Sequence, residues 1–365
     1  MTTYRLALIG FGTVGQGVAE ILAERRDSYW NEFGADFEIV AVSDIKRGSV
    51  YRPSGLDAQT LLQNADDLER IDAPHKGWDA IRTIMECDAD AVLEMAYTNL
   101  ETGEPGYTHA QGALASGKHV VMSNKGPVAL RFPELLELAR NKGRTIGVEA
   151  TVMSGTPTLA LGTEMLKGAG VRKIEGILNG TTNYVLTRMG EGLEYAAALS
   201  EAQEKGYAEA DPTGDVEGID AAGKVAILAN LVMDLPIGIG DVERRGISEL
   251  TAEDLAQAEA DGQVWKLIGT VERAAGERAA GSFVARVAPQ RVAKDHPLAG
   301  ISGATNAVTF TTDYLGDVTL VGPGAGRLET GYAMIADLLK IHRRASGNFA
   351  ASPGSRGGLK GVRVS

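Results

Sequence analysis

Residues 4–15 read YRLALIGFGTVG, and this stretch decides the fold of the first part of the chain. Its apolar start is typical of a buried parallel strand, and residues 14–26 then show helical periodicity. Strand, glycine turn and helix in this order form the dinucleotide-binding fingerprint. Gly10 permits the tight turn, Gly12 lets the backbone approach a pyrophosphate, and Gly15 lets the helix pack on the strand. Thr13 and Val14 open the helix, whose N–H groups face the anion. The alternative is a glycine-rich turn without a ligand.

A second predicted strand, residues 37–44, ends at Asp44, the usual place for the acid that binds the adenosine ribose. The distance from the glycines is longer than usual, because residues 28–36 look like an inserted loop. Asp44 favours NAD, since it would repel a 2′-phosphate, whereas Lys46 and Arg47 could hold that phosphate. The choice between NAD and NADP stays open at this stage.

Two further predicted strands, 90–96 and 118–122, are followed by polar residues. Thr98 and Asn99 follow the first, and Ser123 and Lys125 follow the second. Ligands of open α/β sheets lie beyond the carboxyl ends of the strands, so we expect Lys125 where a nicotinamide and a substrate would meet. The alternative is a lysine in a surface loop. Residues 132–143 are then predicted to form a helix that stops at a glycine.

The middle of the chain is predicted to alternate between strands and helices. Residues 145–168 read as strand, turn and helix, with Thr156 at the N-cap and Pro157 in the first position. Residues 172–189 read as a strand that ends in Asn-Gly-Thr-Thr-Asn. An Asn-Gly hairpin turn is possible, but no alternating strand follows, so we interpret 179–183 as a polar loop at a helix start.

Residues 206–224, GYAEADPTGDVEGIDAAGK, gather five carboxylates before one lysine. A calcium-binding EF-hand is excluded, because its Gly and Glu positions hold Val216 and Ala222. Residues 218–233 are apolar enough for a buried helix, on which Asp220 and Lys224 share a face. A buried charged pair is costly unless compensated, and such pairs mark functional sites. Two interpretations remain: a structural ion pair, or carboxylates and a lysine that hold a zwitterionic amino acid.

The C-terminal part is predicted to contain strands within 277–289 and 306–322. A second glycine cluster, which includes Gly326, then opens a helix over 329–344. This cluster is either a packing turn or a loop that returns to the cofactor. Residues 346–365 are rich in Gly and Ser and are predicted to be flexible.

The 365 residues carry a net charge of −12, enough chain for two domains and no dense basic cluster for nucleic acid. No transmembrane run or signal peptide is visible, so we expect no membrane association. Cys87 is the only cysteine, which excludes an internal disulfide and suits the cytoplasm. Five scattered histidines and one cysteine predict no transition-metal cluster.

Taken together, these motifs resemble the homoserine dehydrogenase family. The spacing Ala202-x3-Gly206-Tyr207-x3-Asp211-Pro212-x2-Asp215-x2-Gly218-x-Asp220-x3-Lys224 is similar to the family signature. TNLETGEPG (98–106), GKHVVMSNKGPVA (117–129), EATVMSGTP (149–157) and NGTTNY (179–184) also match, in the expected order. The resemblance covers residues 4 to 345.

The resemblance implies an α/β protein with a Rossmann-type doubly wound dinucleotide-binding domain and an α+β catalytic and oligomerisation domain with a mixed sheet. We expect these at 1–150 and 151–304, with 305–345 returning to the first domain. The implied reaction interconverts L-aspartate 4-semialdehyde and L-homoserine with NADH or NADPH by direct hydride transfer, in threonine and methionine biosynthesis. A homodimer or homotetramer is implied.

The resemblance also implies residue roles. Lys125 and Lys224 match lysines that stabilise and protonate the aldehyde oxygen. Substrate binding is implied for Glu209, Asp215, Asp220, Asn179, Gly180 and Thr181. Cofactor binding is implied for Gly10, Gly12, Thr13, Val14, Gly15, Asp44, Thr98, Asn99, Ser123, Lys125 and Gly326. A sodium ion is implied at the side chain of Glu149 and the carbonyls of Val152, Ser154 and Thr156.

Two departures from the family and two alternative functions remain. Tyr97 stands where many relatives have a proline, and no regulatory domain is expected after the catalytic region, so feedback by threonine through one is not expected. A semialdehyde dehydrogenase would need a cysteine nucleophile, and Cys87 has no basic neighbour in sequence. A non-catalytic NAD sensor would have lost the lysines or acids, and all are present.

Overall fold

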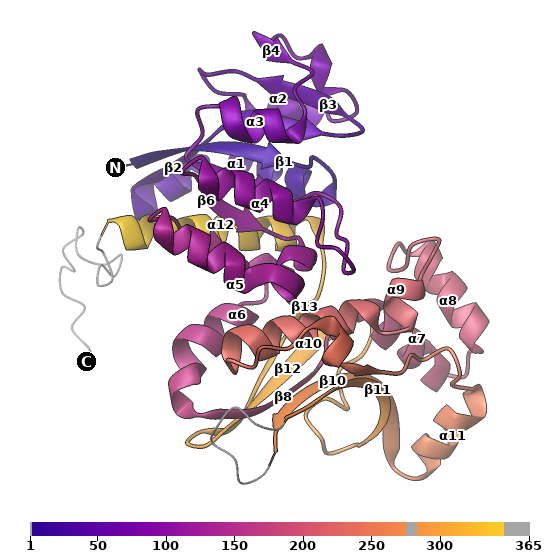
Figure 1. The fold of residues 1–365 in the computed structure, drawn as a ribbon. Helices are drawn as coiled ribbons and strands as arrows, with labels where there is room; N and C mark the ends of the chain where they lie inside the picture. Colours follow the sequence, from indigo (N-terminus) through magenta and orange to yellow (C-terminus); the bar gives the residue numbers. More distant parts are fainter. Residues whose placement is uncertain (1, 275–282, 347–365) are drawn as a thin grey trace, which may run out of the picture.

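The computed structural model describes residues 2–274 and 283–346, and it contains two sheets with helices around each (Figure 1). The predicted flexible tail from residue 347 and the start of the predicted strand 277–289 lie outside the described residues. None of the described helices combines the length and apolarity needed to cross a membrane.

The first sheet has the order β4-β3-β2-β1-β5-β6-β7. Its strands are β1 (Thr2–Ile9), β2 (Ala35–Asp44), β3 (Gly48–Tyr51), β4 (His75–Lys76), β5 (Ala91–Glu94), β6 (His119–Met122) and β7 (Ile146–Gly147). Strands β2, β1, β5, β6 and β7 run parallel, and β3 and β4 extend the β2 edge antiparallel. Because β1 lies at the centre, its carboxyl end falls at the point where the strand order reverses, where dinucleotides bind.

Helices cover both faces of this sheet. They are α1 (Thr13–Phe33), α2 (Ala58–Gln63), α3 (Ala80–Glu86), α4 (Gly106–Ala115), α5 (Lys125–Asn141) and α12 (Arg327–Ala345). Leu6 and Leu8 of β1 pack in one cluster with α1 and α12, whereas Ala7 and Ile9 pack with α4 and α5. This alternation confirms the doubly wound fold, because both faces of β1 are apolar and buried.

Helix α1 is longer than predicted. The stretch 28–36 is not an inserted loop, because α1 continues to Phe33 and ends at Gly34, which adopts a left-handed φ of 70°. Tyr29 is buried and its ring lies 6.1 Å from that of Phe37 in β2. Tertiary packing therefore keeps this polar-looking segment helical.

The second sheet has the order β13-β12-β8-β10-β11-β9. Its strands are β8 (Val171–Ile177), β9 (Glu243–Arg244), β10 (Gln263–Arg273), β11 (Phe283–Ala293), β12 (Thr305–Thr312) and β13 (Gly316–Pro323). All pairs are antiparallel except β9 with β11, so the sheet is mixed, as predicted. Its helices are α6 (Thr158–Ala160), α7 (Gly180–Gly190), α8 (Tyr195–Glu204), α9 (Thr213–Val216), α10 (Ile219–Val232) and α11 (Ala252–Ala260).

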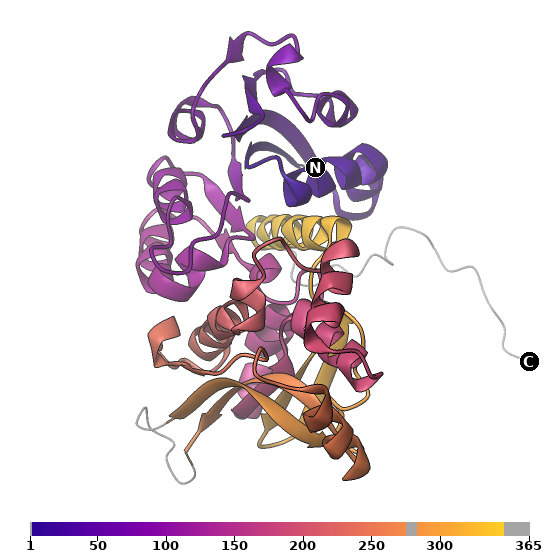
Figure 2. The same ribbon diagram turned by 90° about the vertical axis from the view of Figure 1, so that its right-hand side faces the viewer.

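Two segments connect the sheets. Within the predicted segment 305–345, β12 and β13 complete the second sheet, and α12 then crosses to pack on α1. Figure 2 shows α12 running below the first sheet, at the boundary with the second. Helix α5 makes the other connection, because it packs against α10 of the second part. The chain itself crosses between the two parts after β7 and again between β13 and α12, and the packing of α5 on α10 adds a contact between them.

Candidate active site

The glycine turn after β1 has the geometry that its sequence predicts. Gly10 has a φ of +96°, and a Cβ there would lie 2.5 Å from the Met95 carbonyl oxygen. A Cβ on Gly15 would lie 2.4 Å from the Gly10 oxygen, so both positions require glycine to pack. Gly12 has open space beside it. This space and the N-terminus of α1, with Thr13 and Val14, fit the pyrophosphate of a dinucleotide.

Asp44 lies at the end of β2 beside this turn. One carboxylate oxygen accepts a hydrogen bond from the Phe11 N–H at 2.7 Å, and the other accepts from the Lys46 and Arg47 N–H groups. The Arg47 guanidinium is held by the Ala65 carbonyl at 2.9 Å. Backbone donors thus fix the Asp44 carboxylate in the place where a ribose would lie.

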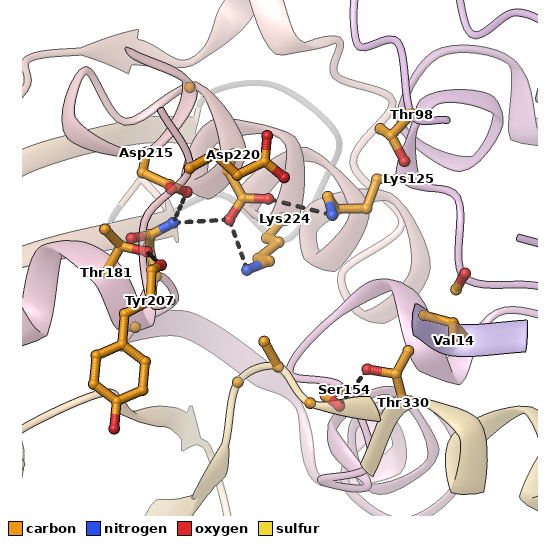
Figure 3. A pocket seen from close by; sticks show the side chains of 18 of the residues that line it. Val14, Thr98, Lys125, Ser154, Thr181, Tyr207, Asp215, Asp220, Lys224 and Thr330 are labelled. Atoms are coloured by element: carbon orange, nitrogen blue, oxygen red, sulfur yellow. Dashed lines mark hydrogen bonds and ion pairs between the residues drawn. The ribbon is translucent and has the colours of Figure 1, made fainter. Parts of the chain in front are cut away.

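A cavity of about 860 Å³ opens between the two sheets. Thirteen of the predicted residues line it: Val14, Thr98, Ser123, Lys125, Ser154, Asn179, Gly180, Thr181, Glu209, Asp215, Asp220, Lys224 and Gly326. The remaining predicted residues lie outside the lining. Asn99, for example, uses its side-chain oxygen to accept from Glu101 and Thr102 N–H groups. Figure 3 shows the two lysines between the α1 end of the cavity, near Val14, and the acidic end.

Asp220 is the centre of the charged network in this cavity (Figure 3). Its Oδ2 lies 2.7 Å from the Lys224 Nζ, and its Oδ1 lies 3.3 Å from the Lys125 Nζ. The Lys224 ammonium also donates to the Leu178 carbonyl at 2.6 Å and is 7% exposed. Burial disfavours the ionised form of Asp220, but the two lysines outweigh burial and hold its pKa below the ordinary value.

Asp215 has the opposite electrostatics although it lies nearby. Burial, and then the negative charge of Asp220, raise its pKa above the ordinary value. The Asn179 Nδ2 donates to both acids, at 2.7 Å to Asp215 and 3.1 Å to Asp220. Asn179 also caps α7, because its side-chain oxygen accepts from the Thr182 N–H. Residues 179–183 are therefore a helix start, as predicted, and not a hairpin.

Helix packing brings Lys125 and Asp220 together across the two sheets. Lys125 is the first residue of α5, which begins before the predicted residue 132, and Asn124 caps it by accepting from the Gly126 N–H. The helix is kinked at Arg131, two residues before Pro133. Asp220 lies in the first turn of α10, which packs on α5. Lys125 is thus a helix residue that faces the cavity and not a lysine of a surface loop.

The acidic loop before α10 forms the rim of the cavity. Glu209 and Asp211 line the opening and are exposed. The Thr181 hydroxyl donates to the Tyr207 carbonyl at 2.5 Å, which ties this loop to the start of α7. Glu217, by contrast, accepts from the Ser248 hydroxyl at 2.7 Å and is not among the lining residues. Only some carboxylates of this loop therefore face the cavity, whereas Glu217 stabilises the loop itself through Ser248.

The segment 149–157 lies beside the cavity and corrects one local prediction. Thr156 is not an N-cap, because α6 begins at Thr158 and the Thr156 hydroxyl donates to the Pro323 carbonyl. Glu149 takes this role instead, since its two carboxylate oxygens accept from the Leu159 and Ala160 N–H groups at 2.8 and 2.7 Å. The buried carboxylate was the better acceptor at this helix start.

Glu149 is also electrostatically unusual. Burial, and then the neighbouring Asp337 of α12, raise its pKa to about 7. Val152 and Ser154 follow in the same turn, in which Ser154 has a φ of 54°. Within residues 2–274 and 283–346 no group of three His, Cys, Asp or Glu side chains could hold a metal ion. Among the described residues, the Glu149 carboxylate contacts the two N–H groups at the start of α6.

Sequence reasoning missed several lining residues, among them Thr330. Its hydroxyl shares a hydrogen bond of 2.8 Å with that of the predicted residue Ser154, which joins the segment after β7 to α12 near the α1 end of the cavity. The second glycine cluster hinted at Thr330, because it precedes α12. Ala304 and Gly324 also line the cavity, and no sequence signal marked Ala304.

Comparisons with known proteins identify the family of this chain. Residues 10–149 match the family model for the homoserine dehydrogenase NAD binding domain, and residues 157–339 match that for homoserine dehydrogenase. An NAD(+)-dependent homoserine dehydrogenase of Pseudomonas canavaninivorans is 46% identical over 95% of this chain and 98% of that protein.

Solved structures agree as well. A homoserine dehydrogenase from Thiobacillus denitrificans superposes with a TM-score of 0.81 and 31% identity, over 98% of this chain and 76% of that one. A hyperthermophilic archaeal homoserine dehydrogenase mutant in complex with NADPH has a TM-score of 0.79 and 28% identity, over 94% of this chain and 98% of that one. The chain is therefore an NAD(P)-dependent oxidoreductase and belongs to the homoserine dehydrogenase family.

Proposed function

We propose that the protein catalyses the reversible, NAD(P)H-dependent reduction of L-aspartate 4-semialdehyde to L-homoserine. One observation carries the proposal: Asp220 lies between two ammonium groups inside the cavity that also receives the glycine-turn end of α1. The cavity volume suits a small amino acid together with the nicotinamide end of a cofactor.

Each end of an amino-acid substrate finds complementary groups in the cavity. Glu209 and Asp215 offer carboxylates to its ammonium group. Gly180 and Thr181 start α7, where the first N–H groups have no partner within the helix and suit its carboxylate. Asn179 donates to both Asp215 and Asp220 and so fixes the two acids relative to α7.

The lysines supply the chemistry at the aldehyde oxygen. The nicotinamide, when bound, supplies the hydride in one direction and accepts it in the other. As the aldehyde carbon gains hydride, its oxygen gains negative charge, which an ammonium group stabilises and protonates. Lys224 already holds Asp220 and the Leu178 carbonyl, whereas among the described residues Lys125 pairs with Asp220 alone, at 3.3 Å. We therefore assign the proton donation to Lys125 and the electrostatic support to Lys224.

We propose NAD as the preferred cofactor. The Asp44 carboxylate is oriented by three backbone N–H groups and would accept the ribose 2′-hydroxyl, whereas a 2′-phosphate would meet its charge. Arg47, one of the two residues that could neutralise that phosphate, is bonded to the Ala65 carbonyl and lies 3.8 Å from Asp66.

We further propose a sodium ion at Glu149, with carbonyls of Val152, Ser154 and Thr156 as the other ligands. The buried carboxylate supports this, because burial and then the charge of Asp337 raise its pKa, and a bound cation would stabilise its ionised form. Turnover measured in sodium, potassium and choline chloride at one ionic strength tests the idea. We expect the wild type to depend on the cation and Glu149→Gln to lose that dependence.

We also propose a homodimer or homotetramer in the cytoplasm, serving threonine and methionine biosynthesis. The second sheet supports association, because its edge strand β13 and the adjoining turn expose Tyr314, Leu315 and Val321. Sedimentation at several concentrations measures the oligomeric state. A monomer at micromolar concentration would contradict this part of the proposal.

The reaction is tested with purified protein, L-homoserine and either NAD or NADP at alkaline pH, by absorbance of the reduced nicotinamide. We expect homoserine-dependent reduction of cofactor, faster with NAD at subsaturating concentration. If neither cofactor is reduced although cofactor binding is measured, the protein acts on another substrate or is an NAD sensor.

Variants test the site. Lys125→Ala and Lys224→Ala should each lower turnover by orders of magnitude, since each removes a cation from the developing oxyanion. Lys167→Ala is the matched control, because Lys167 pairs with Asp234 at 2.7 Å and is not among the lining residues. Cofactor binding, measured by fluorescence titration, should persist in all three. Wild-type turnover in both cavity variants would remove the site assignment.

A further inference from the structure

Asn306 in β12 has a buried side-chain amide that forms no hydrogen bond with the described residues. Its side chain is 0% exposed, and within the described part of the chain neither its Nδ2 nor its Oδ1 has a hydrogen-bond partner. A buried polar group that forms no hydrogen bond lowers stability, so native structures retain few of them. A buried polar group that is retained without a partner therefore suggests a contact with a ligand.

Two glycines of the cavity wall lie beside this amide. A Cβ on Gly324 would lie 2.2 Å from the Asn306 Cγ, and a Cβ on Gly180 would lie 3.4 Å from its Oδ1. Gly180, Gly324 and Ala304 all line the cavity. The amide therefore lies directly behind two residues of the cavity wall that lack side chains, so a ligand at this wall could reach it only past Gly180 or Gly324.

The neighbouring helix start defines what the amide would bind. Gly180 is the first residue of α7, an eleven-residue helix whose cap, Asn179, already bonds the Thr182 N–H. The N–H groups of Gly180 and Thr181 remain for an anion. As placed, the Asn306 Oδ1 lies on the Gly180 side, and a 180° flip of the amide, which keeps its shape, turns the Nδ2 donor towards these N–H groups. The acids of the cavity, Asp215 and Glu209, would meet the opposite charge.

We propose that Asn306 is a further substrate-binding residue, whose amide donates to the α-carboxylate of the amino-acid substrate at the N-terminus of α7. The inference rests on the proposed function, because it takes homoserine as the ligand. It also accounts for the glycine at position 324, because a Cβ there would lie 2.2 Å from the Asn306 Cγ and Nδ2 and would displace the amide.

The test uses the full chain and two variants, Asn306→Leu, which keeps the shape, and Asn306→Ala. A hydrogen bond to a charged group predicts a rise of about 10- to 100-fold in the KM for homoserine. The KM for NAD should stay within about two-fold, a split that a general loss of structure would not produce. The melting temperature without ligand should equal or exceed that of the wild type, because an unpaired amide has been removed.

Thr270→Val is the matched control, since the Thr270 hydroxyl is likewise buried without a partner among described residues but is not among the lining residues. It should leave both KM values unchanged. An unchanged homoserine KM in Asn306→Leu would overturn the inference, and so would loss of folding in both Asn306 variants, which would assign the amide a structural role. Absence of homoserine turnover in the wild type and in Thr270→Val would instead reject the proposed function.

Discussion

Asp220 and Asp215 are five residues apart and share the Asn179 amide, yet replacing each by asparagine should change stability in different directions. Asp220 pairs with Lys224 at 2.7 Å, and the side chains are 20% and 9% exposed. Breaking a buried ion pair costs about 3–5 kcal/mol, because the remaining charge has lost its partner. The amide of Asp220→Asn still accepts one hydrogen bond, about 1 kcal/mol. We therefore expect Asp220→Asn to lower the free energy of unfolding by about 2–4 kcal/mol.

Asp215→Asn should stay within about 1 kcal/mol of the wild type, on the stabilising side. Burial and the charge of Asp220 raise the pKa of Asp215, so its ionised form costs free energy in the folded state. Removing that charge also relieves the repulsion of Asp220, while the amide can keep a hydrogen bond to Asn179. Asp215→Asn is thus the matched control for Asp220→Asn.

The pH dependence follows from the direction of each pKa. The pKa of Asp220 is lowered in the folded state, so its stabilisation is present above the ordinary carboxyl pKa of about 4 and is lost as the pH falls below it. The pKa of Asp215 is raised, so the benefit of Asp215→Asn appears as the pH rises above about 4. Both differences should therefore shrink towards pH 3.

Urea unfolding measures these effects, followed by fluorescence and by far-UV circular dichroism at one protein concentration. Only coincident transitions are converted to free energies, because two domains and an oligomer can unfold in steps. A larger loss in Asp215→Asn than in Asp220→Asn would refute the reasoning, since the two lysines would then not be compensating Asp220.

Two further predictions concern packing and a buried lysine. Gly17→Ala should lower the free energy of unfolding by about 1–3 kcal/mol, because its Cβ would lie 2.1 Å from the Arg327 carbonyl oxygen where α1 crosses α12. Gly190→Ala is the control, because its Cβ would meet nothing within 4 Å, and it should be neutral or slightly stabilising. Equal melting temperatures of the two variants would contradict this prediction. Burial lowers the pKa of Lys266 to about 8. Between pH 8 and the ordinary lysine pKa of about 10.5, the unfolded chain therefore binds more protons than the folded one. The unfolding free energy of the wild type should then rise over this range by about 3 kcal/mol relative to Lys266→Met. Denaturant titrations across that range measure the difference, and parallel pH profiles would show that Lys266 keeps its ordinary pKa.

Local patterns were sufficient for much of the fold and part of the site. The glycine turn, the apolar strands and the capped start of α7 are specified within a few residues, because turn geometry and side-chain periodicity act over that range. The Asp220–Lys224 pair was equally readable, since residues four apart share one helix face. The length of α1 was not, because burial of Tyr29 against Phe37 overrides the polar composition of its last turns.

The sequence by itself thus determined the dinucleotide-binding turn, the alternation of apolar strands with helices, and the acidic loop before the helix that carries Asp220 and Lys224. Only the tertiary structure decided that Lys125 meets the far oxygen of Asp220, because that contact depends on α5 packing against α10. The same holds for Asn306, which looks like any polar residue of a strand until Gly180 and Gly324 are placed around it. Contacts between distant segments are set by how apolar faces pack, and no local pattern records which polar groups that packing brings together.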